Sequence, residues 1–220
     1  MNSLVGGFSV YIHYPWCRHR CPYCDFAIAI APEADIPHER YAQVVLSELE
    51  ARAADFEGSN LATVYVGGGT PSLWEPRSLQ RVLDAVRDRF PGQPTEVTLE
   101  ANPSDCRPEV MALWREAGVS RLSIGVQSFV AEDLVVLGRD HRMGEGLLAV
   151  ERARAAGFDS LSIDLIISVP GAEPDPGLER AIDLAVPHIS TYELTVESRT
   201  PLARAVERGD VVPFDDDVCA

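Results

Sequence analysis

The chain has 220 residues with 34 acidic and 19 basic side chains, a formal net charge of −15, and 46% of its residues are hydrophobic. This composition is typical of an ordinary globular protein with a sizeable core, and the negative balance argues against nucleic acid as the main partner. Because no stretch approaches the roughly 20 apolar residues of a membrane span and the N-terminal residues do not resemble a secretory signal, we expect a cytoplasmic protein without an integral membrane span.

Six short runs of apolar and β-branched residues alternate with longer amphipathic stretches. The strands that we expect lie at residues 8–14, 62–66, 96–100, 121–125, 160–165 and 188–194. The stretches 38–56, 78–90, 107–118, 144–157 and 175–186 repeat apolar positions at three and four residues, which is the helical period. Strands that alternate with helices predict right-handed βαβ units and a parallel sheet, so the fold class is α/β. The pattern is lost beyond about Thr200, and we interpret the acidic run at residues 215–217 as a solvated segment.

The basic side chains are all arginine, and the sequence contains no lysine. The absence of lysine excludes mechanisms that form an imine on a lysine amine. It also excludes a standard P-loop, whose lysine reaches the nucleotide phosphates. A site for an anionic ligand must therefore use arginine, backbone N–H groups or a metal ion.

Residues suited to ligand binding gather at the ends of the predicted strands, where parallel sheets usually bind their ligands. They are, in chain order, Cys17, Cys21, Cys24, the Gly-Gly-Gly-Thr-Pro segment at 67–71, Glu100, Gln127 and Asp164. Asp164 lies inside an otherwise apolar strand, and a buried carboxylate is costly unless it has a partner. We therefore expect one ligand site at this edge of the sheet.

Three of the five cysteines lie within eight positions, as Cys17-x-x-x-Cys21-x-x-Cys24. One interpretation is structural thiols, or a zinc site completed by His13 or His19, although structural zinc commonly takes its ligands as two separated pairs. Iron–sulfur clusters are also held by cysteine thiolates, and three thiolates on a cubane leave one iron without a protein ligand. That open iron would give a small molecule a place to bind, which explains why the loop stops at three cysteines.

The segment YIHYPWCRHRCPYCDF at residues 11–26 resembles the signature loop of the radical S-adenosylmethionine (SAM) enzymes. More narrowly, the chain resembles the family that contains the oxygen-independent coproporphyrinogen III oxidases and the HemW-type heme chaperones. The resemblance implies a partial (β/α)6 barrel with parallel strands, a [4Fe–4S] cluster on the three cysteines, and SAM at the open iron. In that superfamily, an electron from the reduced cluster cleaves the sulfonium of SAM and releases a 5′-deoxyadenosyl radical. We expect the radical SAM core to cover residues 1–199, and residues 200–220 to begin a C-terminal region that is truncated.

The later motifs match the same family in order and spacing. The SAM-binding residues that the resemblance implies are Tyr11, Tyr23, Gly68, Gly69, Thr70, Glu100, Gln127, Arg139 and Asp164. Glycines let a backbone approach the amino group of SAM closely, and arginine can bind a carboxylate through two parallel hydrogen bonds. Taken singly, most of these residues have an ordinary structural explanation, so it is their combination with the cysteines that predicts a SAM site.

Phe26 occupies the position two residues after the third cysteine, where the decarboxylating oxidases of the family carry a further cysteine. This difference favours the chaperone branch, which implies heme or a porphyrin as a further ligand and a heme-acceptor protein as a partner. The resemblance also implies an electron donor such as a flavodoxin or ferredoxin. The His-Asn-x-x-Tyr-Trp heme motif of that branch does not occur in these residues, because none of the five histidines is followed by asparagine.

Three alternatives to the chaperone interpretation stay open. The first is an enzyme, an oxidoreductase that converts coproporphyrinogen III anaerobically to protoporphyrinogen IX. The second is a zinc-binding fold without redox chemistry. The third is radical SAM modification of tRNA, which the negative charge disfavours.

Overall fold

A computed structural model describes residues 7–171 and 176–213, so the acidic run predicted at residues 215–217 lies outside the described residues. The helices and strands are β1 (Phe8–Tyr14), β2 (Trp16–Cys17), β3 (Ala29–Ile30), α1 (His38–Arg52), β4 (Leu61–Gly68), α2 (Pro76–Arg89), β5 (Glu96–Ala101), α3 (Pro108–Glu116), β6 (Arg121–Gln127), α4 (Ala131–Val136), α5 (Glu145–Ala155), β7 (Ser160–Ile167), α6 (Pro176–Asp183), β8 (His188–Glu193) and α7 (Pro201–Glu207). The six long strands begin and end within two residues of the predicted ranges. All five predicted helical stretches contain a helix.

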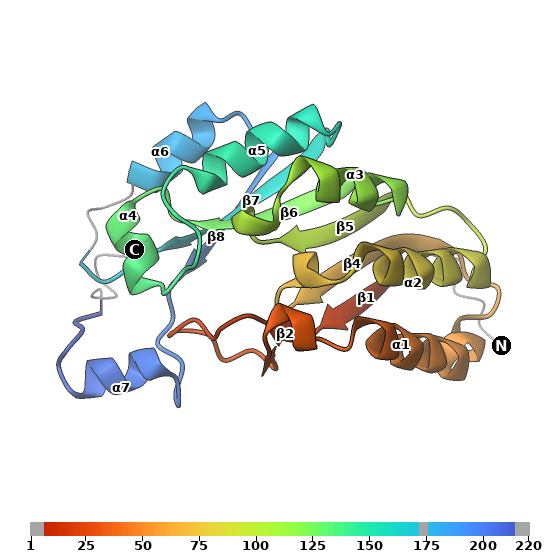
Figure 1. Cartoon of the computed structure of the whole chain (residues 1–220), viewed down its shortest axis with the longest axis horizontal. Helices are drawn as coiled ribbons and strands as arrows, with labels where there is room; N and C mark the ends of the chain where they lie inside the picture. The colour runs from red at the N-terminus through yellow and green to blue at the C-terminus, as the bar shows by residue number, and fades with distance from the viewer. Residues whose placement is uncertain (1–6, 172–175, 214–220) are drawn as a thin grey trace.

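The six long strands form one sheet in the order β1-β4-β5-β6-β7-β8, and every neighbouring pair is parallel. β1 and β8 lie at its two edges, so the sheet is an open, incomplete barrel. Helices α1, α2, α3, α5 and α6 lie along one side of this sheet (Figure 1). The predicted α/β fold with a parallel sheet is confirmed.

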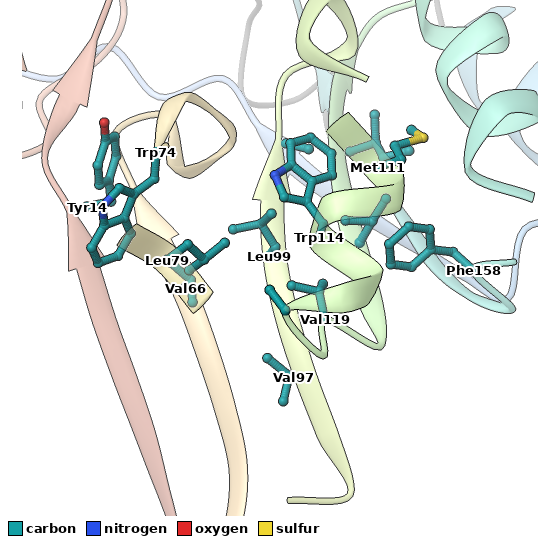
Figure 2. Close-up of a cluster of buried hydrophobic side chains, with 14 of the residues drawn as sticks. Tyr14, Val66, Trp74, Leu79, Val97, Leu99, Met111, Trp114, Val119 and Phe158 are labelled. Carbon is teal, nitrogen blue, oxygen red and sulfur yellow. The ribbon is translucent and has the colours of Figure 1, made fainter. Parts of the chain in front are cut away.

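The helix-covered face of the sheet holds the apolar core. Figure 2 shows Trp114 of α3 beside Leu99 of β5 and Phe158, which lies two residues before β7. These three side chains are at most 1% exposed. Truncation of buried aromatic side chains of this kind costs about 3–5 kcal/mol, so this contact between helices and sheet is a main source of stability.

The other face of the sheet is polar. Parallel sheets are usually covered on both faces, and their strands then read as continuous apolar runs. The strands here alternate instead: in β7, Leu161 and Ile163 are buried among the core residues, while Ser162 and Asp164 point to the opposite face. Hydrogen bonds link the polar residues of neighbouring strands on this face, as between Ser123 and Asp164.

Four short elements were not indicated by the sequence pattern: β2, β3, α4 and α7. β2 and β3 pair with each other as a second, parallel sheet. In α7, the Thr200 hydroxyl accepts a hydrogen bond from the Ala203 N–H at 3.1 Å and so caps the helix. The Leu202 N–H donates to Pro22 O at 2.9 Å, so the segment after Thr200 is ordered against the cysteine-containing loop. None of the helices in residues 7–171 and 176–213 has the length and hydrophobicity of a membrane span.

His141 anchors the loop between α4 and α5. Its ring is 3% exposed, Nε2–H donates to Val126 O at 2.9 Å, and Nδ1 has no hydrogen-bond partner among the described residues. Burial, together with the nearby Arg139 charge, lowers the pKa of His141 from 6.5 to about 4. The folded protein therefore holds this imidazole neutral.

We expect this neutral histidine to make stability depend on pH. Because the folded pKa lies below the unfolded value, the unfolded chain takes up a proton first, so stability falls as pH drops from 6.5 towards 4 and this contribution is constant below that range. At about pH 5 the loss relative to neutral pH is about 2 kcal/mol. Denaturant unfolding of wild type and His141→Gln at both pH values measures it, and an identical pH dependence in the two proteins would contradict the prediction.

Candidate functional site

A cleft of about 410 Å³ lies where the carboxyl ends of the strands meet the loop that follows β1. Eleven of the predicted site residues line it: Cys17, Cys21, Tyr23, Cys24, Gly68, Gly69, Thr70, Glu100, Gln127, Arg139 and Asp164. They come from six separate segments of the chain, which parallel pairing brings to one edge of the sheet. The remaining predicted residue, Tyr11, does not belong to the lining.

The cysteines lie on a loop whose two ends are held together. β2 pairs with β3 across the base of the loop, and the Ala31 N–H donates to Cys17 O at 3.2 Å. Within the loop, the Cys24 N–H donates to Cys21 O at 3.1 Å and forms a tight turn. This local structure keeps three free thiols on one wall of the cleft.

Two neighbouring side chains donate hydrogen bonds to the cysteine sulfurs. The Thr70 hydroxyl donates to Cys17 Sγ at 3.3 Å, and Arg139 Nη1 donates to Cys21 Sγ at 3.7 Å. Burial raises the pKa of the Cys17 thiol, and the Thr70 hydrogen bond opposes that rise. Deprotonation of a thiol in such surroundings is favoured when a bound metal supplies positive charge.

The arrangement of the thiols bears on the kind of metal group that they could hold. Within the described residues, no group of three or more cysteine, histidine, aspartate or glutamate side chains is arranged to hold a metal ion. A structural zinc ion needs four ligands at about 2.0–2.3 Å from one centre. A cubane cluster instead takes each thiolate on a different iron, so three thiols on one short loop can hold it without sharing a single centre.

The glycine segment after β4 packs tightly against the cysteine loop. The Gly69 N–H donates to Tyr14 O at 2.7 Å, and the Thr70 N–H donates to Trp16 O at 2.9 Å. A Cβ on Gly69 would lie 2.7 Å from Trp16 O, and Gly68 has a φ of +119°, which favours glycine. The contact between these two loops therefore requires the glycines. The close approach of a ligand, which the sequence predicted, would be a second reason for them.

The same segment has few N–H groups left for a ligand. Besides the bonds of Gly69 and Thr70, the Gly68 N–H donates to Glu100 Oε2 at 3.0 Å. The segment can thus offer carbonyl oxygens, which accept hydrogen bonds, rather than N–H groups. That donor and acceptor balance suits an ammonium group and does not suit a phosphate.

Two carboxylates lie on the polar face of the sheet at the floor of the cleft. Glu100 accepts from the Tyr65 hydroxyl at 2.8 Å as well as from Gly68. Asp164 accepts from the Ser123 hydroxyl at 3.0 Å. Burial raises the pKa of both carboxyls, and these hydrogen bonds oppose the rise. Each carboxylate retains lone pairs that can accept from a hydroxyl or an ammonium group.

Arg139 is a partly buried cation whose donors are incompletely paired. Its Nη2 lies 3.3 Å from Gly125 O and 3.5 Å from Asn102 Oδ1, both long hydrogen bonds, and its buried Nε has no hydrogen-bond partner among the described residues. Buried donors are normally paired. Because Arg139 also lines the cleft, its guanidinium is placed to bind an anionic group such as a carboxylate.

Gln127 adopts a left-handed backbone conformation with a φ of +64°. Such a conformation is uncommon outside glycine and occurs often at functional sites. A Cβ on Gly125 would lie 2.9 Å from Gln127 Nε2. Gly125 therefore leaves room for the Gln127 side chain at the edge of the cleft.

Tyr11 lies on β1 beside the cleft and not in its lining. Its side chain is 58% exposed, its ring is 6.0 Å from that of Tyr65, and its hydroxyl lies 3.3 Å from His13 Nδ1. Ser123 and Asn102, which line the cleft, and Tyr65, which donates to Glu100, were not predicted. Alternation with period two along β4 and β6 places Tyr65 and Ser123 on the polar face and could have identified them.

The sequence matches the radical SAM superfamily model over residues 11–185. It is 43% identical to the heme chaperone HemW of Mycobacterium tuberculosis over 219 residues, which is 97% of this chain and 56% of that protein. It is 40% identical to HemW of Escherichia coli, covering 94% of this chain and 55% of that protein. The chain thus spans about half the length of the curated relatives it matches.

The fold is also shared with solved structures. Coproporphyrinogen III oxidase (HemN) from Escherichia coli superposes with a TM-score of 0.82 at 25% identity, covering 94% of this chain and 49% of that one. The archaeal Elp3 of Methanocaldococcus infernus has a TM-score of 0.63 at 16% identity and shows the fold alone. The chain belongs to the radical SAM superfamily, and the predicted resemblance to HemW-type heme chaperones is confirmed.

Proposed function

We propose that this chain is the radical SAM core of a HemW-like heme chaperone. It binds a [4Fe–4S] cluster and SAM, and it passes heme to an acceptor protein. The observation that carries the proposal is one cleft with three free thiols on one wall and, around them, an incompletely paired arginine and two partly buried carboxylates. The relatives named heme chaperone HemW support the assignment to this branch.

Cys17, Cys21 and Cys24 would hold the cluster, one thiolate on each of three irons. Bound in this way, a reduced cluster supplies single electrons and an iron that is open to a small ligand. Thr70 and Arg139 donate hydrogen bonds to two of the sulfurs, and such bonds stabilise thiolates and tune the reduction potential of a cluster. An electron donor such as a flavodoxin or ferredoxin would supply the electron.

The polar groups of the cleft complement those of SAM. Arg139 would bind the carboxylate of SAM, because it lines the cleft and its Nη2 is held only by two long hydrogen bonds. Carbonyl groups of the glycine segment would accept from the amino group. Glu100 and Asp164 would accept from ribose hydroxyls or from the amino group, since each has free lone pairs. Tyr23 and Gln127 would complete the walls.

Phe26 lines the cleft and is 63% exposed, so a side chain that cannot ligate iron stands beside the cysteines. This supports a chaperone over a decarboxylating oxidase. The function is tested by anaerobic reconstitution, followed by EPR spectra with and without SAM and by heme titration.

The expected outcome of that test is a cluster whose EPR signal changes with SAM, together with stoichiometric heme binding. Protoporphyrinogen IX and 5′-deoxyadenosine from coproporphyrinogen III would instead identify an oxidase. One zinc per chain without iron or sulfide would identify a zinc protein. Either result would exclude the chaperone proposal.

The three cysteines should each be needed for iron. Replacement of Cys17, Cys21 or Cys24 by alanine is expected to lower iron retention about tenfold or more, because a lost thiolate leaves an iron exposed. Iron and sulfide analysis of reconstituted protein measures this. Cys106→Ala is the matched control, since Cys106 is a free but fully buried thiol away from the cleft lining. Equal iron in all four variants would contradict the assignment.

Arg139 should contribute to SAM affinity through its charge. Arg139→Gln removes a charge-assisted hydrogen bond, so the dissociation constant for SAM is expected to rise about 10–100-fold. Calorimetric titration of cluster-loaded protein measures the constant, with values normalised to iron content because Arg139 also contacts Cys21. The exposed Arg142 provides the control variant Arg142→Gln. An unchanged constant in Arg139→Gln would show that SAM does not use this residue.

A further inference from the structure

Arg18, the residue after Cys17, is held by a buried carboxylate that has no part in the function proposed above. Its Nη2 lies 2.7 Å from Asp105 Oδ1 and 2.8 Å from Glu33 Oε2. The side chain of Asp105 is 7% exposed, whereas that of Glu33 is 55% exposed. Exposed ion pairs contribute little, but removing one partner of a buried pair leaves an uncompensated charge. Asp105 is therefore the partner that constrains Arg18.

Asp105 is itself fixed by two further loops. Its Oδ2 accepts from the Ser72 hydroxyl at 2.6 Å, and Ser72 Oγ accepts from the Asn102 N–H at 3.1 Å. Ser72 lies in the 3₁₀ turn Pro71–Leu73 after β4, and Asp105 ends the 3₁₀ turn Pro103–Asp105 after β5. One carboxylate thus joins the loops that follow three neighbouring strands, β1, β4 and β5.

The same segment also reaches the second cysteine. Asn102 Oδ1 accepts from Arg139 Nη2 at 3.5 Å, and Arg139 Nη1 donates to Cys21 Sγ at 3.7 Å. Asn102 Nδ2 donates in turn to Asp140 Oδ1 at 2.9 Å. Residues 102–105 are therefore connected to the cysteine loop twice, beside Cys17 through Arg18 and at Cys21 through Arg139.

We propose that Asp105 is a positioning residue for the iron–sulfur site. By fixing Arg18 it fixes the backbone from which Cys17 projects, and it does so without contacting a sulfur. A loop that is already held in its binding conformation loses less conformational freedom when it takes up a cluster. Removal of the Asp105 charge should therefore loosen the loop and speed the loss of iron. This inference rests on the proposed cluster.

The experiment measures iron release from anaerobically reconstituted protein to an excess of chelator, together with the melting temperature of the iron-free protein. Asp105→Asn and Arg18→Gln are each expected to speed release about tenfold. The double variant should release iron no faster than either single one, because both substitutions break the same pair. Arg18→Lys keeps the positive charge, so this variant should keep most of the iron retention of wild type. Glu33→Gln, which breaks only the exposed pair, should stay within about twofold of wild type.

Two results would overturn the proposal while leaving the cluster assignment intact. One is an Asp105→Asn protein that releases iron at the wild-type rate. The other is a Glu33→Gln effect as large as that of Asp105→Asn. If Asp105→Asn fails to fold, Arg18→Gln and Arg18→Lys decide the question, because Arg18 lies on the loop itself. A wild-type chain that takes up neither iron nor sulfide would instead remove the proposed function and this inference together.

Discussion

The parallel pairing of β1 with β4 is the constraint on which the site depends. Their ladder runs in register to Tyr14 and Gly68, and hydrogen bonding continues past the strand ends, from Gly69 N–H to Tyr14 O and from Thr70 N–H to Trp16 O. The cysteine loop and the glycine segment are therefore extensions of one ladder. Because the two backbones touch, no Cβ fits between them, and the thiol of Cys17 comes within reach of the Thr70 hydroxyl.

A second consequence follows from a sheet whose two faces differ in polarity. The helix-covered face supplies the hydrophobic stabilisation, which leaves the other face free to carry groups that destabilise the fold. Glu100 and Asp164 are such groups, because burial raises the pKa of each carboxyl and hydrogen bonds from Tyr65, Gly68 and Ser123 offset only part of that cost. Residues that conflict with ordinary packing and hydrogen-bonding rules, as these carboxylates do, occur most often at functional sites. A ligand that donates hydrogen bonds to these carboxylates would offset more of the cost.

How much of this could be predicted depends on how far apart in the chain the interacting residues lie. The strands, the three cysteines and the glycine segment are signalled by short local patterns, and each was predicted to lie where the structure places it. The alternation of side chains along β4 also indicates that Tyr65 lies on the polar face, so this residue could have been predicted in the same way. The pairing of Arg18 with Asp105 joins segments separated by three strands and two α-helices, so no local pattern reveals it. Tyr11 is the opposite case. It lies in a local motif and was therefore predicted as a site residue, but its side chain does not line the cleft.

The charges at the cleft distinguish its two arginines. The chain carries a net charge of −15, and a cluster held by three thiolates would add further negative charge to the cleft. Arg18 lines the cleft but its charge is already balanced by Asp105 and Glu33. Arg139 has no such ion pair among the described residues, and its donors reach a thiol sulfur and two weakly bound oxygens. The two arginines therefore act differently: Arg18 orders the loop that carries the cysteines, and Arg139 keeps its charge available to sulfur and ligand.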